Sequence, residues 1–282
     1  MSRTLISRIR SYYDNLSKSD QAISDYLIAN IDSAARLSIQ EFAQKTHVST
    51  ATISRFSKKI GFNSFQELKL AIHATDSSRD DEFFSELSPT DDYKEILTKN
   101  FNGNISSLNS TLNLITNREL DQTMEILLNA STCGFFGLGG SNAVALIAFH
   151  KFLRMPLHCV YHQDFHFQQM QAAKLTSDDC AFVISHTGKN RDTMHLVEIL
   201  KSRGVPIIAL TSFASSPLAK AADVALISIS EEISFRPEAV ASTVSQISLL
   251  DALFMMYGMK MKNVSEGTLS EIRKVIRDSR IS

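Results

Sequence analysis

Residues 185–193 read Ser-His-Thr-Gly-Lys-Asn-Arg-Asp-Thr and bring hydroxyls, a glycine and basic groups into one short stretch. An apolar run that suits a buried strand, 181–184, precedes them, and residues with helical spacing, 194–200, follow. The stretch is therefore a strand-to-helix turn, where unpaired backbone N–H groups and the helix dipole favour an anion. Its hydroxyl donors and its permissive glycine are Ser185, Thr187, Thr193 and Gly188. These groups suit a small phosphate; the alternative is a helix cap with ordinary hydroxyl turn chemistry.

Two other strand-to-helix turns carry glycine or hydroxyl groups. Residues 137–142, Gly-Leu-Gly-Gly-Ser-Asn, are not a dinucleotide fingerprint, because Asn142 stands where the third glycine belongs. Residues 211–217, Thr-Ser-Phe-Ala-Ser-Ser-Pro, end with a proline suited to a helix start. The turn at 185–193 is not a P-loop either, because Val183 occupies the first glycine position.

The elements that must position these turns alternate as short apolar runs and helical patterns from residue 130 onwards. Strands are predicted at 132–137, 157–161, 180–185, 206–210 and 224–229. Helices are predicted at 141–153, 167–175, 192–203, 218–222 and 238–259, and two more, 92–116 and 118–128, lead into this region. The alternation predicts an α/β domain whose parallel five-stranded sheet is flanked by helices and binds ligands at the carboxyl ends of its strands.

The front of the chain is predicted to be helical, with helices over 17–30, 39–45, 50–60 and 64–74. Residues 39–56 fit a helix-turn-helix unit, although His47 stands at the turn position where glycine is usual. The side of the third helix that faces DNA is predicted to carry Ser49, Thr50, Ala51, Thr52, Ser54, Arg55, Lys58 and Lys59. The alternative is a protein-binding helical module with a solvated basic face; we favour DNA.

Length and charge fit two domains, one of them suited to nucleic acid. A chain of 282 residues exceeds one typical core. Residues 1–75 hold 10 basic and 6 acidic residues, residues 76–99 hold 3 and 8, and residues 100–282 hold 16 of each. We therefore predict a helix-turn-helix domain over 1–77, an acidic linker over 78–91 and the α/β domain over 92–282.

Several other classes of protein are disfavoured. No apolar run approaches the ~18 residues of a membrane span, and no secretory signal is visible, so we expect a cytoplasmic protein that binds no membrane. Cys133, Cys159 and Cys180 lie far apart in the sequence and suit core positions in a reducing compartment. His162 and His166 have metal-ligand spacing without a convincing third ligand, so we expect neither a metal nor a cofactor.

The chain resembles a known family in both parts. The three turns of the α/β region are similar to those of a sugar isomerase (SIS) domain. Residues 51–62, Ala-Thr-Ile-Ser-Arg-Phe-Ser-Lys-Lys-Ile-Gly-Phe, resemble the recognition helix and exit of the RpiR family of bacterial transcriptional regulators. The resemblance covers nearly the whole chain, in the family's domain order.

The resemblance implies a set of phosphosugar-binding residues. The phosphate would be held by Ser185, Thr187, Gly188 and Thr193, assisted by Thr211 or Ser212. Ser141, in the turn with Gly139 and Gly140, would lie near the sugar. Asn190 replaces the Ser or Thr of enzymatic members, so one phosphate hydroxyl is missing. The resemblance extends to Asp164 and His166. His166 is a candidate sugar contact; the alternative is a surface histidine beside a helix-start aspartate. Glu238 lies near the position where isomerase members keep a glutamate.

The function that follows is a regulator, expected to be a repressor of sugar-metabolism genes, that binds a double-stranded DNA operator and responds to a phosphosugar. It is expected to act as a dimer or tetramer on a roughly palindromic operator and to have no enzymatic activity. The runner-up is a phosphosugar isomerase or related sugar-processing enzyme with a helical N-terminal extension. Its candidate bases are Glu238 and His186, although Glu238 also suits a helix start. A third alternative is an interaction scaffold that binds no DNA.

Overall fold

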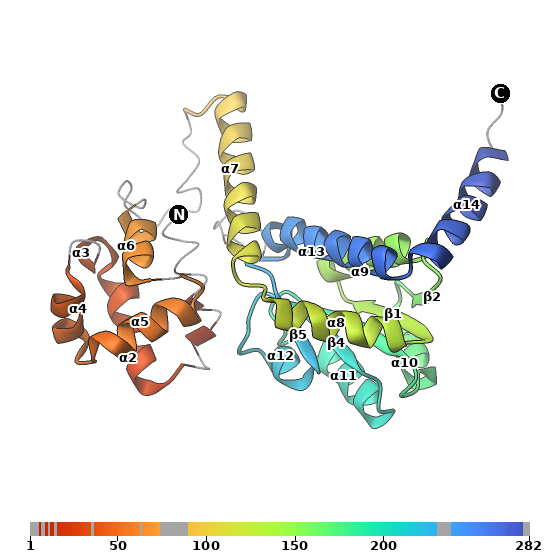
Figure 1. Cartoon of the computed structure of the whole chain (residues 1–282), viewed down its shortest axis with the longest axis horizontal. Helices are drawn as coiled ribbons and strands as arrows, with labels where there is room; N and C mark the ends of the chain where they lie inside the picture. The colour runs from red at the N-terminus through yellow and green to blue at the C-terminus, as the bar shows by residue number, and fades with distance from the viewer. Residues whose placement is uncertain are drawn as a thin grey trace. The chain divides into compact units, whose positions relative to one another are not determined.

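The computed structural model describes residues 6, 9–10, 12–13, 16–34, 37–62, 64–73, 90–229 and 238–278 (Figure 1). The chain divides into two compact units. One comprises 1–115, 212–215 and 227–245, and the other comprises 116–211, 216–226 and 246–282. The predicted domain boundary at 77 and most of the predicted linker, 78–91, fall at 74–89, outside the described residues. None of the helices in the described part is long and apolar enough to span a membrane.

The described helices of the front part are α2 (Lys18–Ala29), α3 (Ile31–Ala34), α4 (Ile39–Thr46), α5 (Thr50–Lys59) and α6 (Phe65–His73). Hydroxyl caps start three of them, because Ser17, Ser38 and Ser49 each accept a hydrogen bond from the backbone N–H three residues on. The Glu41 carboxylate in turn accepts from the Ser38 N–H, which completes a capping box. Hydrogen bonds from the Ser38 backbone and hydroxyl lower the pKa of this carboxyl. The predicted helices are confirmed. The four-residue α3 was not predicted, because it is too short for a helical period to be visible in the sequence.

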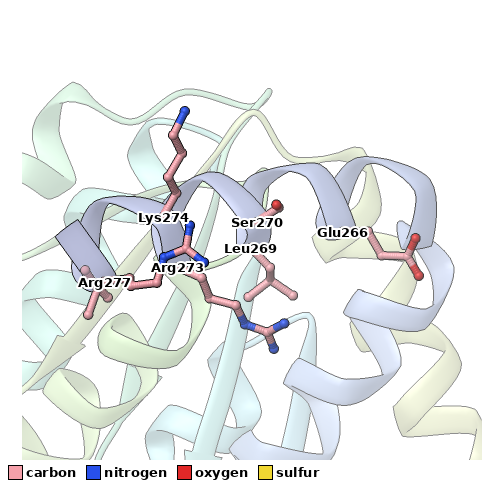
Figure 2. Close-up of a pocket in the computed structure, with 7 residues that line it drawn as sticks. Glu266, Leu269, Ser270, Arg273, Lys274 and Arg277 are labelled. Atoms are coloured by element: carbon pink, nitrogen blue, oxygen red, sulfur yellow. The ribbon is translucent and has the colours of Figure 1, made fainter.

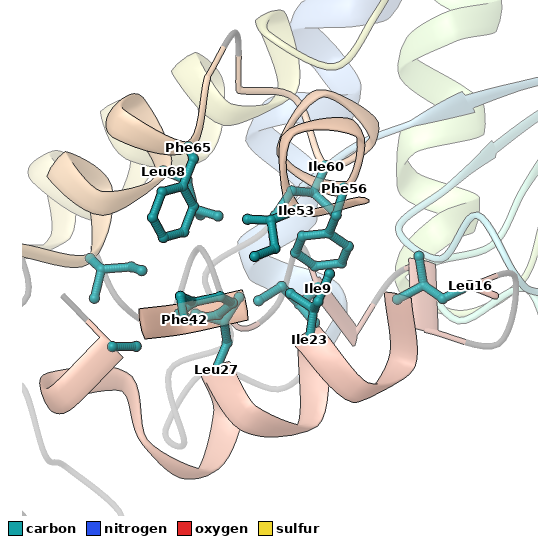
Figure 3. Packing of buried hydrophobic residues seen from close by; sticks show 12 residues of the cluster. Ile9, Leu16, Ile23, Leu27, Phe42, Ile53, Phe56, Ile60, Phe65 and Leu68 are labelled. Atoms are coloured by element: carbon teal, nitrogen blue, oxygen red, sulfur yellow. The ribbon is translucent and has the colours of Figure 1, made fainter. Parts of the chain in front are cut away.

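An apolar cluster holds these helices together (Figure 3). Ile53 and Phe56 of α5 are fully buried together with Ile23 and Leu27 of α2, and Phe42 of α4 lies among them. His47 ends α4 with a positive φ of 54°, the conformation that glycine adopts most easily. The departure from glycine is therefore accommodated without a change in the turn.

In the second part of the chain α7 (Tyr93–Leu112) and α8 (Asn117–Asn129) precede a five-stranded sheet. Its strands are β1 (Thr132–Gly137), β2 (His158–Tyr161), β3 (Cys180–Ile184), β4 (Ile207–Thr211) and β5 (Val224–Ile227). Their order is β2-β1-β3-β4-β5, and the strands run parallel. The predicted strands are confirmed with small shifts at their ends. Strand β5 ends two residues before its predicted limit, and the Ile229 N–H beyond it donates to the Thr111 hydroxyl at 2.9 Å.

Helices cover both faces of this sheet, namely α9 (Gly140–Phe152), α10 (Phe165–Lys174), α11 (Arg191–Ser202), α12 (Pro217–Ala221) and α13 (Glu238–Lys260) (Figure 1). Phe152 of α9 contacts Phe135 and Phe182 on one face of the sheet and Tyr257 of α13 above them. Residues of α10 and α11 pack with Phe136 on the other face. The neighbouring strand residues thus point to opposite faces, as the two-residue period of a strand requires.

One further helix, α14 (Lys262–Asp278), was not predicted. It follows α13 after a single residue, Met261. Its apolar residues Leu269, Ile272 and Ile276 recur at helical spacing, so this helix was recognisable from the sequence.

Candidate functional site

The candidate site lies at the topological switch point of the sheet, between the neighbouring strands β1 and β3. Strand β1 leads through residues 138–139 into α9, and its neighbour β3 leads through residues 185–190 into α11. Gly137, at the end of β1, is paired with Ile184, at the end of β3, so the two turns begin side by side. In open parallel sheets of this order, ligands bind at the carboxyl ends of the two strands at this switch point.

The turn after β3 is held by its own hydroxyls and by the neighbouring strand. Ser185 Oγ accepts a hydrogen bond from Gly188 N–H (3.2 Å), and Thr187 Oγ1 accepts one from Lys189 N–H (3.4 Å). The Thr211 hydroxyl, at the end of β4, donates to the His186 carbonyl at 3.0 Å. The predicted phosphate residues Ser185, Thr187 and Gly188 therefore come together, and Thr211 joins them across the sheet.

Gly188 is required by both conformation and space. Its φ is +60°, a region that other L-residues rarely adopt. A Cβ at this position would lie 2.7 Å from Ser216 Cβ and 3.0 Å from Thr211 Oγ1. The Gly188 carbonyl also accepts from Leu218 N–H at 3.1 Å, which ties the turn to the start of α12. Ser216, at the cap of α12, is thus a part of the site that the residue-by-residue prediction did not include.

Asn190 has a local role at the start of α11. It is the N-cap of α11, and its Oδ1 accepts from Thr193 N–H at 3.0 Å. Thr193 is only 2% exposed, and its hydroxyl lies 3.5 Å from the same Oδ1. The helix-cap alternative considered for this stretch therefore describes Asn190 and Thr193 well, while the hydroxyls of 185–187 belong to the turn itself.

The turn after β1 has no side-chain cap at the start of α9, but hydrogen bonds with other side chains hold the strand end that precedes it. Gly139, with φ +55°, precedes α9, and the helix has no side-chain cap. Gln168 of α10 is fully buried and makes two hydrogen bonds with the Gly137 backbone, at 3.2 Å to its N–H and 3.0 Å to its carbonyl. Asn142 Nδ2 donates to the same carbonyl (3.0 Å) and its Oδ1 accepts from the Tyr161 hydroxyl (2.6 Å). Gly140 and Ser141 are thereby fixed at the first turn of α9.

These supporting residues carried no signal in the sequence. Gln168 and Asn142 meet Gly137 from 31 and 5 residues away in the chain, and nothing in their own surroundings predicts those bonds.

The remaining candidates make other contacts, are exposed, or have side chains outside the described residues. Ser212 shares a hydrogen bond with the Ser228 hydroxyl at 3.3 Å. His166 is exposed in the first turn of α10, whose cap is Asp164. Glu238 is the first residue of α13, and its side chain lies outside the described residues.

Cys133 and Cys180 are buried, and Cys159 is partly buried. Cys133 is paired in register with Cys159 on β2 and with Cys180 on β3, so the three thiols form a row across the sheet. Burial raises the pKa of the Cys159 thiol to about 12 and raises that of Cys133 as well. In the described part of the chain no group of three or more His, Cys, Asp or Glu side chains is placed to bind a metal ion.

The predicted DNA surface is the exposed side of α5. Arg55 is exposed, and its guanidinium donates to the Thr52 hydroxyl (3.3 Å), which lies 2.9 Å from the Ser49 hydroxyl. Thr50, Ala51 and Lys58 are also exposed, and Ser54 is half-buried with its hydroxyl bonded to the Thr50 carbonyl. Lys59 forms a 3.1 Å ion pair with Asp20 of α2, so its ammonium also joins α5 to α2.

Comparison with known proteins matches two regions of the chain to known domain families. Residues 3–79 match the helix-turn-helix domain of the rpiR family, and residues 126–256 match the SIS domain. An uncharacterised HTH-type transcriptional regulator of Caldanaerobacter subterraneus is 33% identical over 92% of both chains. The HTH-type transcriptional regulator HexR of Pseudomonas aeruginosa is 32% identical over 89% of this chain and 88% of its own length. The Vibrio vulnificus NanR protein, solved in complex with ManNAc-6P, has a similar fold, with a TM-score of 0.63 and 23% identity over 99% of this chain and 100% of that chain.

Proposed function

Because the chain belongs to the RpiR family of HTH-type transcriptional regulators, with an SIS domain behind its DNA-binding domain, we propose a specific division of labour between its residues. The exposed side of α5 binds a double-stranded DNA operator. The turn at 185–193 binds the phosphate of a small phosphosugar, and the turn at 138–141 lies near the sugar. The protein acts in the cytoplasm as a dimer or tetramer and represses genes of sugar metabolism.

The observation that carries the effector site is the group of hydroxyls and amides at the switch point. Ser185, Thr187, Gly188 and Thr211 converge on one turn, beside a helix, α9, whose start has no side-chain cap. Neutral hydroxyls and backbone N–H groups are suitable donors for a phosphate, because hydrogen bonds to a charged group are about twice as strong as neutral ones. Asn190 caps α11 by accepting a hydrogen bond from the Thr193 N–H, and so contributes to the site indirectly, by holding the start of this helix.

The effector changes transcription only if it binds one arrangement of the two DNA-binding domains more tightly than another. If the effector favours the arrangement that does not fit the operator, its binding releases the protein from DNA, and the protein is a repressor that the effector relieves. A palindromic operator matches the two-fold symmetry of a dimer, with one α5 helix in the major groove of each half-site.

The effector site is tested by thermal unfolding of the full chain with phosphosugars, including ManNAc-6P, beside their unphosphorylated parents. A ligand at about 100 times its dissociation constant adds about 2.7 kcal/mol to the free energy of unfolding. We expect one phosphosugar to raise the unfolding midpoint and its parent to leave it unchanged. If no phosphosugar raises the midpoint, or the parent does so equally, the phosphate site is wrong. Isomerised product in the same samples would overturn the proposal of a sensor without enzymatic activity.

Replacing Arg55 with Ala should weaken operator binding while the phosphosugar shift stays unchanged. Arg55 is exposed near the start of α5, where a guanidinium can reach a base edge or a phosphate, and loss of such a contact costs about 1–3 kcal/mol, or roughly 5- to 150-fold in affinity. Lys69→Ala on α6 removes one positive charge elsewhere in the helical part and serves as the control. Equal DNA affinity of the Arg55→Ala and Lys69→Ala proteins in a titration at fixed salt would remove Arg55 from the interface.

A further inference from the structure

Helix α14 exposes apolar side chains that the described part of the chain does not bury. Val264, Val275 and Ile276 are 53%, 69% and 48% exposed, and Leu269 and Ile272 recur with them at helical spacing. Figure 1 shows α14 extending beyond the end of α13, away from the sheet. A helix of 17 residues that is polar on one side and apolar on the other gains its stability from packing that apolar side against something.

The charges of α14 are unevenly distributed along its length. Figure 2 shows Glu266 towards one end and Arg273, Lys274 and Arg277 towards the other, with Leu269 between them. A hollow runs along this flank from Glu266 to Arg277. Glu266, Arg273 and Arg277 are separated by seven and four residues, so they lie on one flank of the helix, beside the apolar side.

We infer that α14 packs against α14 of a second copy of this chain, with the two helices antiparallel. The inference rests on the proposed dimeric regulator and names the surface through which its copies meet. In a parallel pair, Glu266 would face Glu266 and Arg277 would face Arg277. In an antiparallel pair centred on Ile272, Arg273 lies across from Glu271 of the second copy. Glu266 is level with Asp278 of the second copy and one residue from its Arg277. The apolar residues of the two helices then meet, with Ile272 against its own counterpart.

The mixed charge of α14 favours this occupant over others. Lys262, Arg273, Lys274 and Arg277 are balanced by Glu266, Glu271 and Asp278, whereas a helix that binds nucleic acid or an anionic membrane carries a large basic excess. A stable dimer buries about 800 Å² on each copy. The exposed Met255 and Met259 at the end of α13, 61% and 78% exposed, add apolar surface next to the start of α14. A two-fold pair uses the same patch twice, which is the commonest symmetry of soluble oligomers.

A cysteine placed at the centre of the pair tests the geometry directly. Under mild oxidation the Ile272→Cys protein should form covalent dimers, because the two-fold axis brings residue 272 of each copy together. Gly267→Cys is the matched control, because position 267 is exposed, lies outside the lining of the hollow and has open space for a side chain, and this protein should remain largely monomeric on a denaturing gel. The native thiols do not compete, because Cys133 and Cys180 are buried and the pKa of Cys159 is about 12. Equal cross-linking of the two variants, or none of the first, would overturn the inference.

Charge reversal supplies a second test that leaves the apolar residues in place. Arg277→Glu should raise the dimer dissociation constant at least about tenfold, measured by sedimentation, because it sets like charges opposite each other twice in each dimer. The double variant Glu266→Arg with Arg277→Glu should restore the wild-type constant. Unchanged association of the single variant, or failure of the double variant to recover while its circular dichroism stays native, would overturn the surface. If each variant still shows the rise in unfolding midpoint with phosphosugar, the effector site is intact, and a failed result here concerns only the dimer surface.

Discussion

Replacing Gly188 with Ala should lower the affinity for the phosphosugar at least about 100-fold and lower the free energy of unfolding by about 2–5 kcal/mol. The φ of +60° costs an L-residue about 1–2 kcal/mol. The added methyl group must also displace Ser216 or Thr211, and such overpacking costs a further 1–3 kcal/mol or so. Displacement of either hydroxyl opens the turn that forms the phosphate site. Calorimetric titration and chemical denaturation measure the two effects.

Gly204 provides the matched control for this experiment. Its φ is +69°, but a Cβ there would approach only Ser177 Cβ, at 3.7 Å. Gly204→Ala should therefore carry the backbone cost of about 1–2 kcal/mol and leave phosphosugar affinity unchanged. If Gly188→Ala and Gly204→Ala behave alike in both measurements, the close contact at Gly188 has no role in binding.

Replacing both Ser185 and Thr187 with Ala should abolish most effector binding. A hydrogen bond from a hydroxyl to a charged group contributes about 1.5–3 kcal/mol, so two of them account for at least about a 100-fold change in affinity. The loss of Ser185 Oγ also removes the acceptor of Gly188 N–H inside a buried turn. DNA affinity in the absence of effector should stay at the wild-type value.

Ser202→Ala is the control for the hydroxyl substitutions. Ser202 ends α11 on the exposed side of the domain, where its hydroxyl donates to the Ile199 carbonyl. Its loss should change neither phosphosugar affinity nor DNA affinity. Wild-type effector affinity in the Ser185→Ala, Thr187→Ala protein would show that the phosphate lies elsewhere.

Much of the fold was predictable because its determinants are local. Ser38 and Glu41 form a capping box three residues apart, and Pro217 stands at the first position of α12, so each helix start can be recognised from a few adjacent residues. The strands are short and apolar and alternate with helical patterns, which is sufficient to predict a parallel sheet. The turn at 185–193 was identified for the same reason, since its hydroxyls and glycine are contiguous.

What escaped prediction depends on contacts between distant parts of the chain. Gln168 meets Gly137 across 31 residues, and the Lys59–Asp20 ion pair joins positions 39 residues apart. A single sequence contains no sign of either partner. The cap formed by Asn190 is local, by contrast, and fits the helix-cap alternative that the sequence offers for this stretch. Helix α14 is different, because its apolar residues Leu269, Ile272 and Ile276 recur at helical spacing and made it recognisable from the sequence.

The most direct test of the account is a titration of operator DNA with the full-length protein in the presence and absence of the phosphosugar that raises its unfolding midpoint. The operator is selected with the protein from a random duplex library, and the salt concentration is held constant. We expect the phosphosugar to weaken DNA binding by the wild-type protein by roughly 5- to 150-fold, the usual range of coupling between two sites. We expect it to leave the DNA affinity of the Ser185→Ala, Thr187→Ala protein unchanged. Equal DNA affinity of the wild-type protein with and without a phosphosugar that demonstrably binds it would contradict the claim that this chain is a phosphosugar-responsive regulator.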